Sequence, residues 1–340
     1  MIMFVKIVLI VSLSCLPCYL SFQDDWELKQ FSTFGSKLYY ESSDFNTTED
    51  VIQEDRRRVK QWMSVETVPG AVFGLSIKGK TVWTEAFGHI DIENNVTTTK
   101  TSLWRLASIS KTMTSSLVAL LTERGLIDLN KSIHDYVSED LFPRKTFFGK
   151  PVNITVRQLL SHTAGLRSLQ LPEDFSKVIR ASNISQSIAG LKNDRLLLRP
   201  GAHFLYSNYG FQLVGAIIES VLNNSFPNEI RKMFVSLGMN SSFPDIRGRI
   251  HRNRPRYYQL SKNGNETVLQ NADILDDLAV YEGWWAMGGL MSTVEDMLTF
   301  GNAWLSSYKG RNDSIFVLFL MSFELIILKI LFRFPEEGNG

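Results

Sequence analysis

Cysteine is almost absent from this sequence of 340 residues. The two cysteines, Cys15 and Cys18, form a C-x-x-C pattern inside an apolar stretch near the start. Such a pattern in an apolar stretch is more typical of a signal peptide than of a redox or metal pair. We therefore expect the mature chain to contain no disulfide bond.

The sequence also has no metal-ligand pattern and little net charge. The histidines show no ligand spacing, so we expect neither a metal ion nor another cofactor. The formal net charge of +1 gives no global field for nucleic acid, an anionic membrane or an acidic substrate. A basic run over residues 247–256 has no interleaved aromatic side chains, which favours a solvated loop. The five histidines are His89, His134, His162, His203 and His251.

The start of the sequence has the order of charged and apolar residues found in secretory signals. Lys6 precedes the apolar run 7–20, so residues 1–22 are expected to be a signal peptide. An uncleaved signal-anchor is the alternative, because the run is borderline for spanning a bilayer. Nine N-x-[ST] sequons also favour a secreted glycoprotein. They lie at Asn46, Asn95, Asn130, Asn153, Asn183, Asn223, Asn240, Asn265 and Asn312.

Periodicity predicts a surface helix and a hairpin before a buried helix. A helix over residues 50–63 would carry its arginines on a solvated face. The β-rich runs 71–77 and 81–87 flank Lys78-Gly79-Lys80, which is typical of a hairpin. Apolar residues at helical spacing then predict a helix over 109–124.

The second half of the chain is predicted to be mostly helix and loop. Helical patterns cover residues 156–161 and 211–222, and a further helical pattern covers 292–300. Residues 228–270 are polar and basic, with one short apolar patch. At 44% hydrophobic residues, the chain has enough apolar material for one large core or two packed subdomains.

Ser108-Ile-Ser-Lys111 is the first candidate site. Positions i and i+3 share a helix face, so the amine of Lys111 can reach the Ser108 hydroxyl. At the first turn, the helix dipole would stabilise an alkoxide or oxyanion. The S-x-x-K pattern alone is weak, because Ser306-Ser-Tyr-Lys309 also matches it. The alternative for Ser108 is an N-cap serine of an ordinary core helix.

Tyr206-Ser-Asn208 is the second candidate site and the only Y-x-N of the sequence. A phenol can relay a proton between nucleophile and leaving group, and a nearby amide can hold a substrate carbonyl. The alternative is a turn after Pro200-Gly201 with packing aromatic residues. Either reading keeps Tyr206 and Asn208 close to each other.

Five motifs in this order and spacing resemble the serine β-lactamase-like family over residues 59–304. That family includes class C β-lactamases, D-alanyl-D-alanine carboxypeptidases, related esterases and animal mitochondrial members. The motifs are Val68-Pro-Gly-Ala71, Arg105-Leu-Ala-Ser-Ile-Ser-Lys111, Ser161-His-Thr-Ala-Gly-Leu-Arg167, Phe204-Leu-Tyr-Ser-Asn208 and Met287-Gly-Gly-Leu-Met-Ser-Thr293.

The resemblance implies an α/β fold, with an antiparallel sheet flanked by helices and a mostly helical subdomain at about residues 136–280. The family-related domain would cover residues 59–310, after an N-terminal extension at 23–58. These boundaries leave residues 311–340 as an apolar tail outside the family pattern.

The resemblance also implies a role for each candidate residue. Ser108 would be the acylated nucleophile and Lys111 the base that takes its proton. Tyr206 would be the second proton-transfer group, and Asn208 a substrate contact. His162 lies in the family's histidine-containing turn, where a structural role is implied. Family members need no metal.

The sequence departs from the family at its third catalytic motif. A K-T-G or H-[ST]-G strand is absent after Gly289, and the apolar run 315–332 follows instead. Glu324 and Lys329 would each cost about 2.5–3.5 kcal/mol in a membrane helix, which disfavours a transmembrane span. A chain end read from non-coding sequence explains the run better. We therefore expect the late strands to be missing and the chain to be inactive or unstable.

Two functions follow from these expectations. The first is a serine hydrolase of peptidase or esterase type, acting on a small peptide, amide or ester. The second is a non-catalytic protein of the same fold that interacts with partners or forms filaments. We expect no nucleic-acid partner, and both a membrane tether and a homo-oligomer are left open. The expected location is the secretory pathway, with mitochondria as the alternative that the family resemblance implies.

Overall fold

The computed structural model describes residues 48–169, 181–246, 248–263, 266–272 and 283–308. The expected signal peptide and apolar tail lie outside these ranges. None of the described helices has the length and apolar content that crossing a membrane requires. The chain forms two compact units, Met1–Ser102 with Arg252–Asp277, and Leu103–His251 with Leu278–Gly340. The domain boundaries expected from the sequence stay a prediction.

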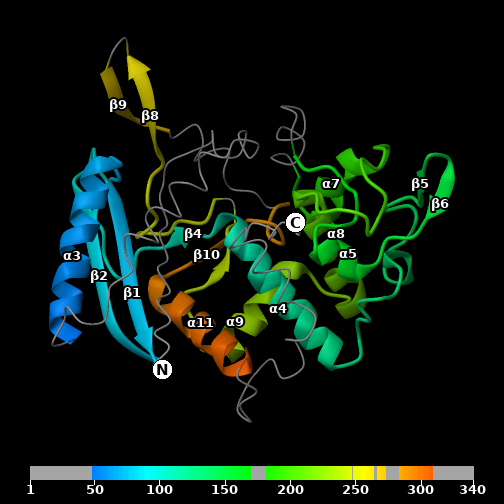
Figure 1. The fold of residues 1–340 in the computed structure, drawn as a ribbon, viewed down its shortest axis with the longest axis horizontal. Helices are drawn as coiled ribbons and strands as arrows, with labels where there is room; N and C mark the ends of the chain where they lie inside the picture. Colours follow the sequence, from blue (N-terminus) through cyan, green and yellow to red (C-terminus); the bar gives the residue numbers. More distant parts are fainter. Residues whose placement is uncertain (1–47, 170–180, 247, 264–265, 273–282, 309–340) are drawn as a thin grey trace, which may run out of the picture. The chain divides into compact units, whose positions relative to one another are not determined.

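The first unit contains the predicted surface helix and hairpin (Figure 1). Helix α3 (Thr48–Val65) is followed by β1 (Gly70–Ile77), β2 (Lys80–Asp91) and β3 (Val96–Thr97), which form an antiparallel sheet in the order β1-β2-β3. These elements confirm the helix and the hairpin that periodicity predicted.

The β1–β2 turn explains why the hairpin forms at Lys78-Gly79. Both residues have positive φ, 52° for Lys78 and 83° for Gly79. Two consecutive positive φ angles match the twist of the flanking strands, and glycine adopts them without strain. The turn therefore sets the register in which Ile77 faces Lys80.

The apolar face of α3 packs on the β1–β2 hairpin. Val59 of α3 is buried with Ala71, Phe73 and Phe87 of the sheet. The Phe73 ring lies edge-on to Trp62 at 6.3 Å and edge-on to Phe87 at 5.9 Å between ring centroids. Aromatic pairs in this geometry add to the stabilisation from buried area.

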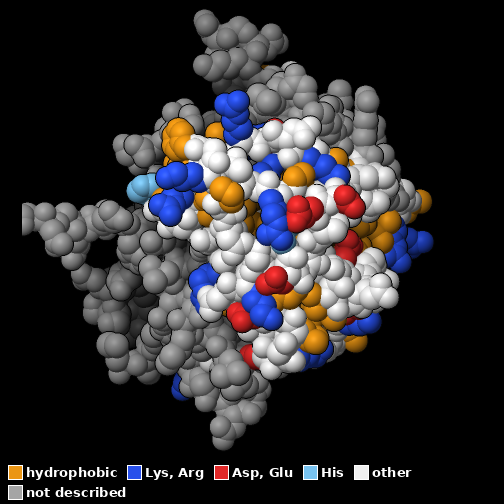
Figure 2. Space-filling view, turned by 90° about the vertical axis from the view of Figure 1, so that its right-hand side faces the viewer, with side chains coloured by type: hydrophobic (Ala, Val, Ile, Leu, Met, Phe, Trp, Pro, Cys, Tyr) orange, Lys and Arg blue, Asp and Glu red, His pale blue; other side chains and the backbone are white. Residues whose placement is uncertain are grey.

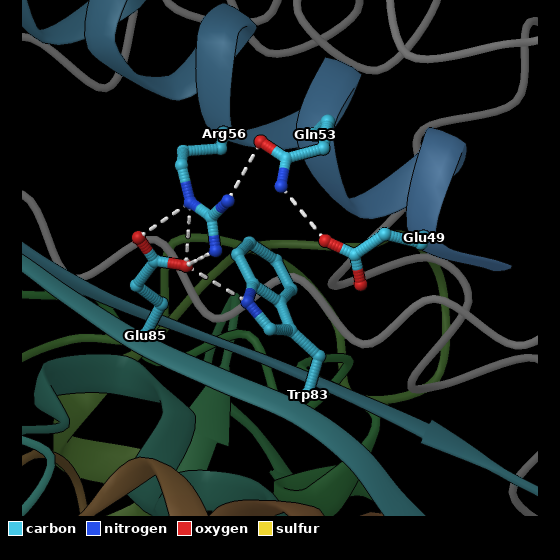
Figure 3. A network of polar contacts seen from close by, with 5 residues as sticks. All are labelled: Glu49, Gln53, Arg56, Trp83 and Glu85. Atoms are coloured by element: carbon cyan, nitrogen blue, oxygen red, sulfur yellow. Dashed lines mark hydrogen bonds and ion pairs between the residues drawn. The ribbon is translucent and has the colours of Figure 1, made fainter.

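An ion pair also joins α3 to strand β2 (Figure 3). Arg56 donates from Nε to Glu85 Oε1 at 2.8 Å and from its terminal nitrogen to Oε2 at 2.7 Å. Trp83 Nε1 donates to the same carboxylate at 3.0 Å. The Arg56 guanidinium holds the pKa of Glu85 below its usual range. The expectation of a wholly solvated arginine face on this helix is therefore wrong for Arg56.

The described residues of the basic run, 248–256, form no helix or strand and, except for Pro255, are exposed or half-buried, as expected of a loop. An unpredicted hairpin follows this run. Strands β8 (Tyr258–Asn263) and β9 (Glu266–Asn271) form an antiparallel hairpin. Arg256 pairs with Asp91 at 3.1 Å and with Glu93 at 2.8 Å, which satisfies its charge. The sequence missed this hairpin because its strands are largely polar.

The second unit carries short strands and most of the helices. Strand β10 (Leu290–Ser292) lies between β4 (Trp104–Arg105) and β7 (Phe243–Pro244) and runs antiparallel to both. A separate hairpin joins β5 (Lys145–Phe147) to β6 (Lys150–Val152). Its helical elements are η1 (Ala107–Ile109), α4 (Ser110–Glu123), η2 (Ile133–Asp135), α5 (Val156–Leu160), α7 (Ile184–Ile188), η3 (Ala189–Leu191), α8 (Asn208–Leu222), α9 (Phe226–Ser236) and α11 (Val294–Tyr308).

Helices α4 and α8 form the centre of this unit. Met113 and Val118 of α4, and Phe211 and Leu213 of α8, have no exposed surface. Helix α8 contacts α4, α5 and α7. On the surface, Figure 2 shows Lys and Arg side chains interspersed with Asp and Glu, so the described side chains of that face carry charge of both signs.

The packing of α3 on the hairpin makes a stability prediction. Phe73 is 4% exposed and Val82 of β2 is 43% exposed. We expect Phe73→Ala to lower the free energy of unfolding by about 3–5 kcal/mol, because it leaves a cavity between α3 and the sheet. The control Val82→Ala should change it by about 0.5 kcal/mol or less. Denaturant titration followed by tryptophan fluorescence measures both, and equal losses would contradict the packing.

Candidate active site

The four predicted site residues meet at the start of two central helices. Ser108 lies in the 3-10 turn η1 that leads into α4, and Lys111 lies in the first turn of α4. Tyr206 precedes α8, and Asn208 is its first residue. The Ser108 Oγ and Tyr206 Oη atoms are 2.7 Å apart, although the residues are 98 positions apart in sequence. The fold therefore brings together both candidate motifs.

The amine of Lys111 is surrounded by three oxygens. Its Nζ atom lies 3.1 Å from Ser108 Oγ, 2.9 Å from Asn208 Oδ1 and 2.6 Å from the Met287 carbonyl oxygen. The residue is 1% exposed, and burial without a carboxylate partner disfavours the ammonium form. Burial accordingly holds the pKa of Lys111 well below the ordinary 10.5 of a lysine.

Aromatic rings line the remaining side of the lysine. The Nζ atom lies 5.0 Å from the centroid of the Tyr206 ring and 5.7 Å from that of Phe211. A ring face attracts the ammonium form only weakly compared with a carboxylate. The rings therefore exclude water from Lys111 without restoring its ordinary pKa.

The backbone before Ser108 is unusual. Ala107 has φ of 43°, in the left-handed region that residues with a side chain adopt at a cost. Helix α4 has Ile109 as its N-cap and no side-chain capping bond. The Ser108 hydroxyl contacts Tyr206 and Lys111 instead. The N-cap alternative for Ser108 is therefore wrong.

Short strands fix the 3-10 turn and the Met287 carbonyl in place. The Leu106 amide donates to the Leu290 carbonyl at 2.9 Å, and the Leu290 amide donates to Ser110 Oγ at 3.3 Å. Arg105 forms an ion pair with the buried Asp245 at 2.7 Å. The chain just before Ser108 is thus hydrogen-bonded to the segment that contains Met287, whose carbonyl oxygen accepts from the Lys111 amine.

The segment that carries Tyr206 and Asn208 is held by the turn after α5. The Ser207 hydroxyl donates to the Arg167 carbonyl at 2.8 Å and accepts from the Gly210 amide at 3.1 Å, so Ser207 caps α8. The Asn208 amide and its side-chain nitrogen both donate to Ser168 Oγ at 3.2 Å. With Nδ2 donating to Ser168, Asn208 presents Oδ1 to Lys111.

Sequence reasoning missed three contributors to this site. The Met287 carbonyl and the Ser168 hydroxyl contact the lysine and the asparagine, and Ala107 supplies the left-handed turn. Met287 and Ala107 both belong to motifs that the family resemblance had singled out, and this is the signal that could have found them. Within the described ranges, no three His, Cys, Asp or Glu side chains cluster as metal ligands would. The expectation that no cofactor is used stays a prediction.

Comparisons with known proteins agree on the family. The sequence profile of the beta-lactamase family matches residues 56–315. The human serine beta-lactamase-like protein LACTB, mitochondrial, is 30% identical over an alignment of 315 positions, and the match covers 73% of this chain and 56% of that protein. The chain thus spans little more than half the length of this curated relative.

Solved structures show the same fold. The octameric penicillin-binding protein homologue from Pyrococcus abyssi has a TM-score of 0.63 and 27% identity, covering 78% of this chain and 57% of that one. EstCE1, a hydrolase with promiscuous acyltransferase activity, has a TM-score of 0.64 and 20% identity, covering 76% and 73%. A class C beta-lactamase has a TM-score of 0.57 and 21% identity, covering 78% and 67%.

The fold is that of the β-lactamases and penicillin-binding proteins, a class of serine hydrolases, and the expected α/β fold class is confirmed. With its profile match over residues 56–315, this chain belongs to the beta-lactamase family. The family resemblance read from its motifs is likewise confirmed.

The turn after α5 makes a stability prediction. Gly165 has φ of 74°, and an added Cβ would lie 2.0 Å from the Leu198 carbonyl oxygen. We expect Gly165→Ala to lower the free energy of unfolding by about 3 kcal/mol or more, because a backbone atom must move. Gly149 has φ of 75° with nothing within 4 Å, so Gly149→Ala should cost only about 1 kcal/mol of strain. Thermal melting compares the two, and equal shifts would contradict the close approach.

Proposed function

We propose that this protein is a serine hydrolase that forms an acyl-enzyme on Ser108. The observation that carries the proposal is the buried Lys111 amine, placed 3.1 Å from the Ser108 hydroxyl with no carboxylate of the described residues among its hydrogen-bond partners. A lysine in ordinary solvent is protonated and cannot take a proton at neutral pH. Burial therefore prepares Lys111 to act as a general base.

The geometry of the amine supports that role. A neutral amine has two N–H groups and one lone pair. Asn208 Oδ1 and the Met287 carbonyl, at 2.9 and 2.6 Å, can accept the two N–H bonds. The lone pair then faces Ser108 Oγ and can accept the hydroxyl proton. Asn208 and Met287 thus orient the base in addition to any contact that Asn208 makes with substrate.

The reaction follows from these positions. Ser108 Oγ attacks the carbonyl carbon of an amide or ester while its proton passes to Lys111 Nζ. The tetrahedral intermediate collapses when the bond to the leaving group breaks; Tyr206 donates its hydroxyl proton to that group and is reprotonated by the proton that Lys111 took from Ser108. Water then attacks the acyl-serine while neutral Lys111 takes one of its protons, and the acid is released when the bond to Ser108 Oγ breaks and that oxygen takes the proton back from Lys111.

Substrate class is proposed from the site and the relatives. The names of the solved neighbours describe a β-lactamase, penicillin-binding proteins and a hydrolase with acyltransferase activity. All are consistent with acyl transfer from an amide or ester to a serine. We therefore propose a small peptide, amide or ester as substrate. The name of the Pyrococcus neighbour also supports the proposal of a homo-oligomer.

The roles of Ser108 and Lys111 can be tested by covalent labelling. We expect a fluorophosphonate or β-lactam probe to label the wild-type chain at Ser108, as located by peptide mass spectrometry. Ser108→Ala should abolish labelling, and Lys111→Ala should slow it by about 10²- to 10⁴-fold. Ser241→Ala is the control, because Ser241 is exposed and donates to Asp296 through its backbone amide, which alanine keeps. Labelling that survives Ser108→Ala would contradict the proposal.

The lowered lysine pKa predicts the pH dependence of acylation. Only neutral Lys111 can accept the proton, so the rate rises with pH as the ammonium form is lost and then levels off. We expect the midpoint of this rise to lie well below 10.5, because burial disfavours the charge. Stopped-time labelling across pH, corrected for Ser108→Ala, gives the midpoint. A midpoint near 10.5 would show that the amine is not desolvated.

A non-catalytic role is the second candidate that the sequence analysis left open. The expectation that the chain is inactive or unstable likewise stays a prediction. A chain that melts cooperatively yet resists every serine probe supports the non-catalytic role. Labelling of Ser108 in a folded chain supports the hydrolase.

Location has two candidates. The secretory route is a prediction from residues 1–22 and from the sequons. The name of the human relative, which includes the word mitochondrial, supports the alternative. Expression in animal cells distinguishes them. A mass decrease after peptide N-glycosidase treatment supports the secretory route, and co-fractionation with mitochondria without that decrease supports the other.

A further inference from the structure

His162 lies beside Tyr206 and contacts the chain on both sides of it. The Leu205 amide donates to the His162 carbonyl at 2.7 Å, and the Ser207 amide donates to His162 Nδ1 at 3.1 Å. One residue thus fixes the backbone immediately before and immediately after Tyr206. These bonds restrict the torsion angles of the residue whose hydroxyl lies 2.7 Å from Ser108 Oγ.

The imidazole also restricts the tyrosine side chain. The His162 and Tyr206 rings lie 4.5 Å apart between centroids, with 36° between their planes. Phe211 of α8 lies on the imidazole as well, at 5.2 Å. The phenol oxygen of Tyr206 changes position only when the ring itself moves. A neighbouring ring packed against it therefore limits the rotamers that Tyr206 can adopt.

The protonation state of the His162 imidazole allows its Nδ1 atom to accept a hydrogen bond. His162 is 1% exposed, and burial, together with the nearby Lys111, lowers its pKa to about 3. The ring is therefore neutral at physiological pH. Since Nδ1 accepts the Ser207 amide, the proton lies on Nε2. Protonation of Nδ1 would remove this acceptor.

His162 has two features that cost stability. Its φ is 55°, in the left-handed region, and its buried Nε2 has no hydrogen-bond partner among the described residues. An asparagine would adopt this backbone angle readily. Neither feature is explained by a histidine that only fills space.

We infer that His162 is a positioning residue for Tyr206, which holds the phenol hydroxyl against Ser108 through the backbone on both sides of the tyrosine. This inference rests on the proposed serine-hydrolase function. It goes beyond a structural role for the turn, because it assigns the effect of His162 to one catalytic group. His162 itself takes no part in the attack by Ser108 or in the proton transfer to Lys111.

Two substitutions separate the acceptor from the bulk of the ring. His162→Asn places Oδ1 where Nδ1 lies and tolerates the left-handed backbone, so it keeps the bond to Ser207. His162→Leu keeps apolar bulk and lacks an acceptor. We expect His162→Leu to reduce the acylation rate constant by about 10- to 100-fold, as misplacement of a reacting group does, with little change in the probe concentration at half-saturation. His162→Asn should recover most of the rate.

The coupling to Tyr206 is tested by a double-mutant cycle. If His162 acts through Tyr206, adding His162→Leu to Tyr206→Phe should slow acylation little further. Multiplicative losses would overturn the inference, as would a leucine variant as fast as the wild type or an asparagine variant no better than leucine. Cooperative thermal melting of each variant establishes that the rates are those of folded protein.

A readout independent of activity distinguishes failure of the inference from failure of the proposed function. Amide hydrogen exchange at Ser207 should be slow in the wild type and in His162→Asn, and at least about 10-fold faster in His162→Leu, because only leucine leaves that amide without its acceptor. A wild-type chain that no probe labels overturns the proposed function. Unchanged exchange at Ser207 in the leucine variant overturns the positioning role by itself.

Discussion

Burial of one lysine amine is the constraint on which the site depends. Removing Lys111 from water disfavours its charge, and no carboxylate of the described residues bonds to the amine to offset that cost. The chain instead supplies a side-chain amide oxygen, a backbone carbonyl and a serine hydroxyl. These groups form hydrogen bonds with the amine but do not stabilise its protonated form as a carboxylate would. Packing of α4 against α8 is what keeps water out, so the stability of this unit and its chemistry share one origin.

The elements around the amine have distinct tasks. The β4–β10–β7 strands hold the chain on both sides of the nucleophile turn, since the Leu106 and Leu290 backbones are bonded to each other. The turn after α5 holds the tyrosine segment by hydrogen bonds from Ser207 and Asn208. Left-handed angles at Ala107 and His162 occur in both supports. Backbone strain therefore lies in the two segments that bring Ser108 and Tyr206 together, as expected of a functional site.

Much of this could be predicted from the sequence, for physical reasons. Helix α4 and the β1–β2 hairpin follow from local periodicity and from the Lys78-Gly79 turn. Helix α9 was missed because its polar and charged residues mask buried Phe226, Ile230 and Phe234, although their spacing is helical. The Met287 carbonyl could not be found by residue type, since every residue has one. Arg56 was misplaced because nothing in the helix alone reveals that Glu85 lies opposite.

The long separation of the site's parts in sequence has a consequence for biosynthesis. Lys111 meets the Met287 carbonyl across 176 positions, and Ser108 meets Tyr206 across 98. While the chain emerges from the ribosome, the first helix exists without either partner, and its amine remains hydrated and protonated. Its serine is then an ordinary alcohol. Reactivity is acquired only when the last of these segments docks, so an unfinished or misfolded chain would not be acylated at Ser108.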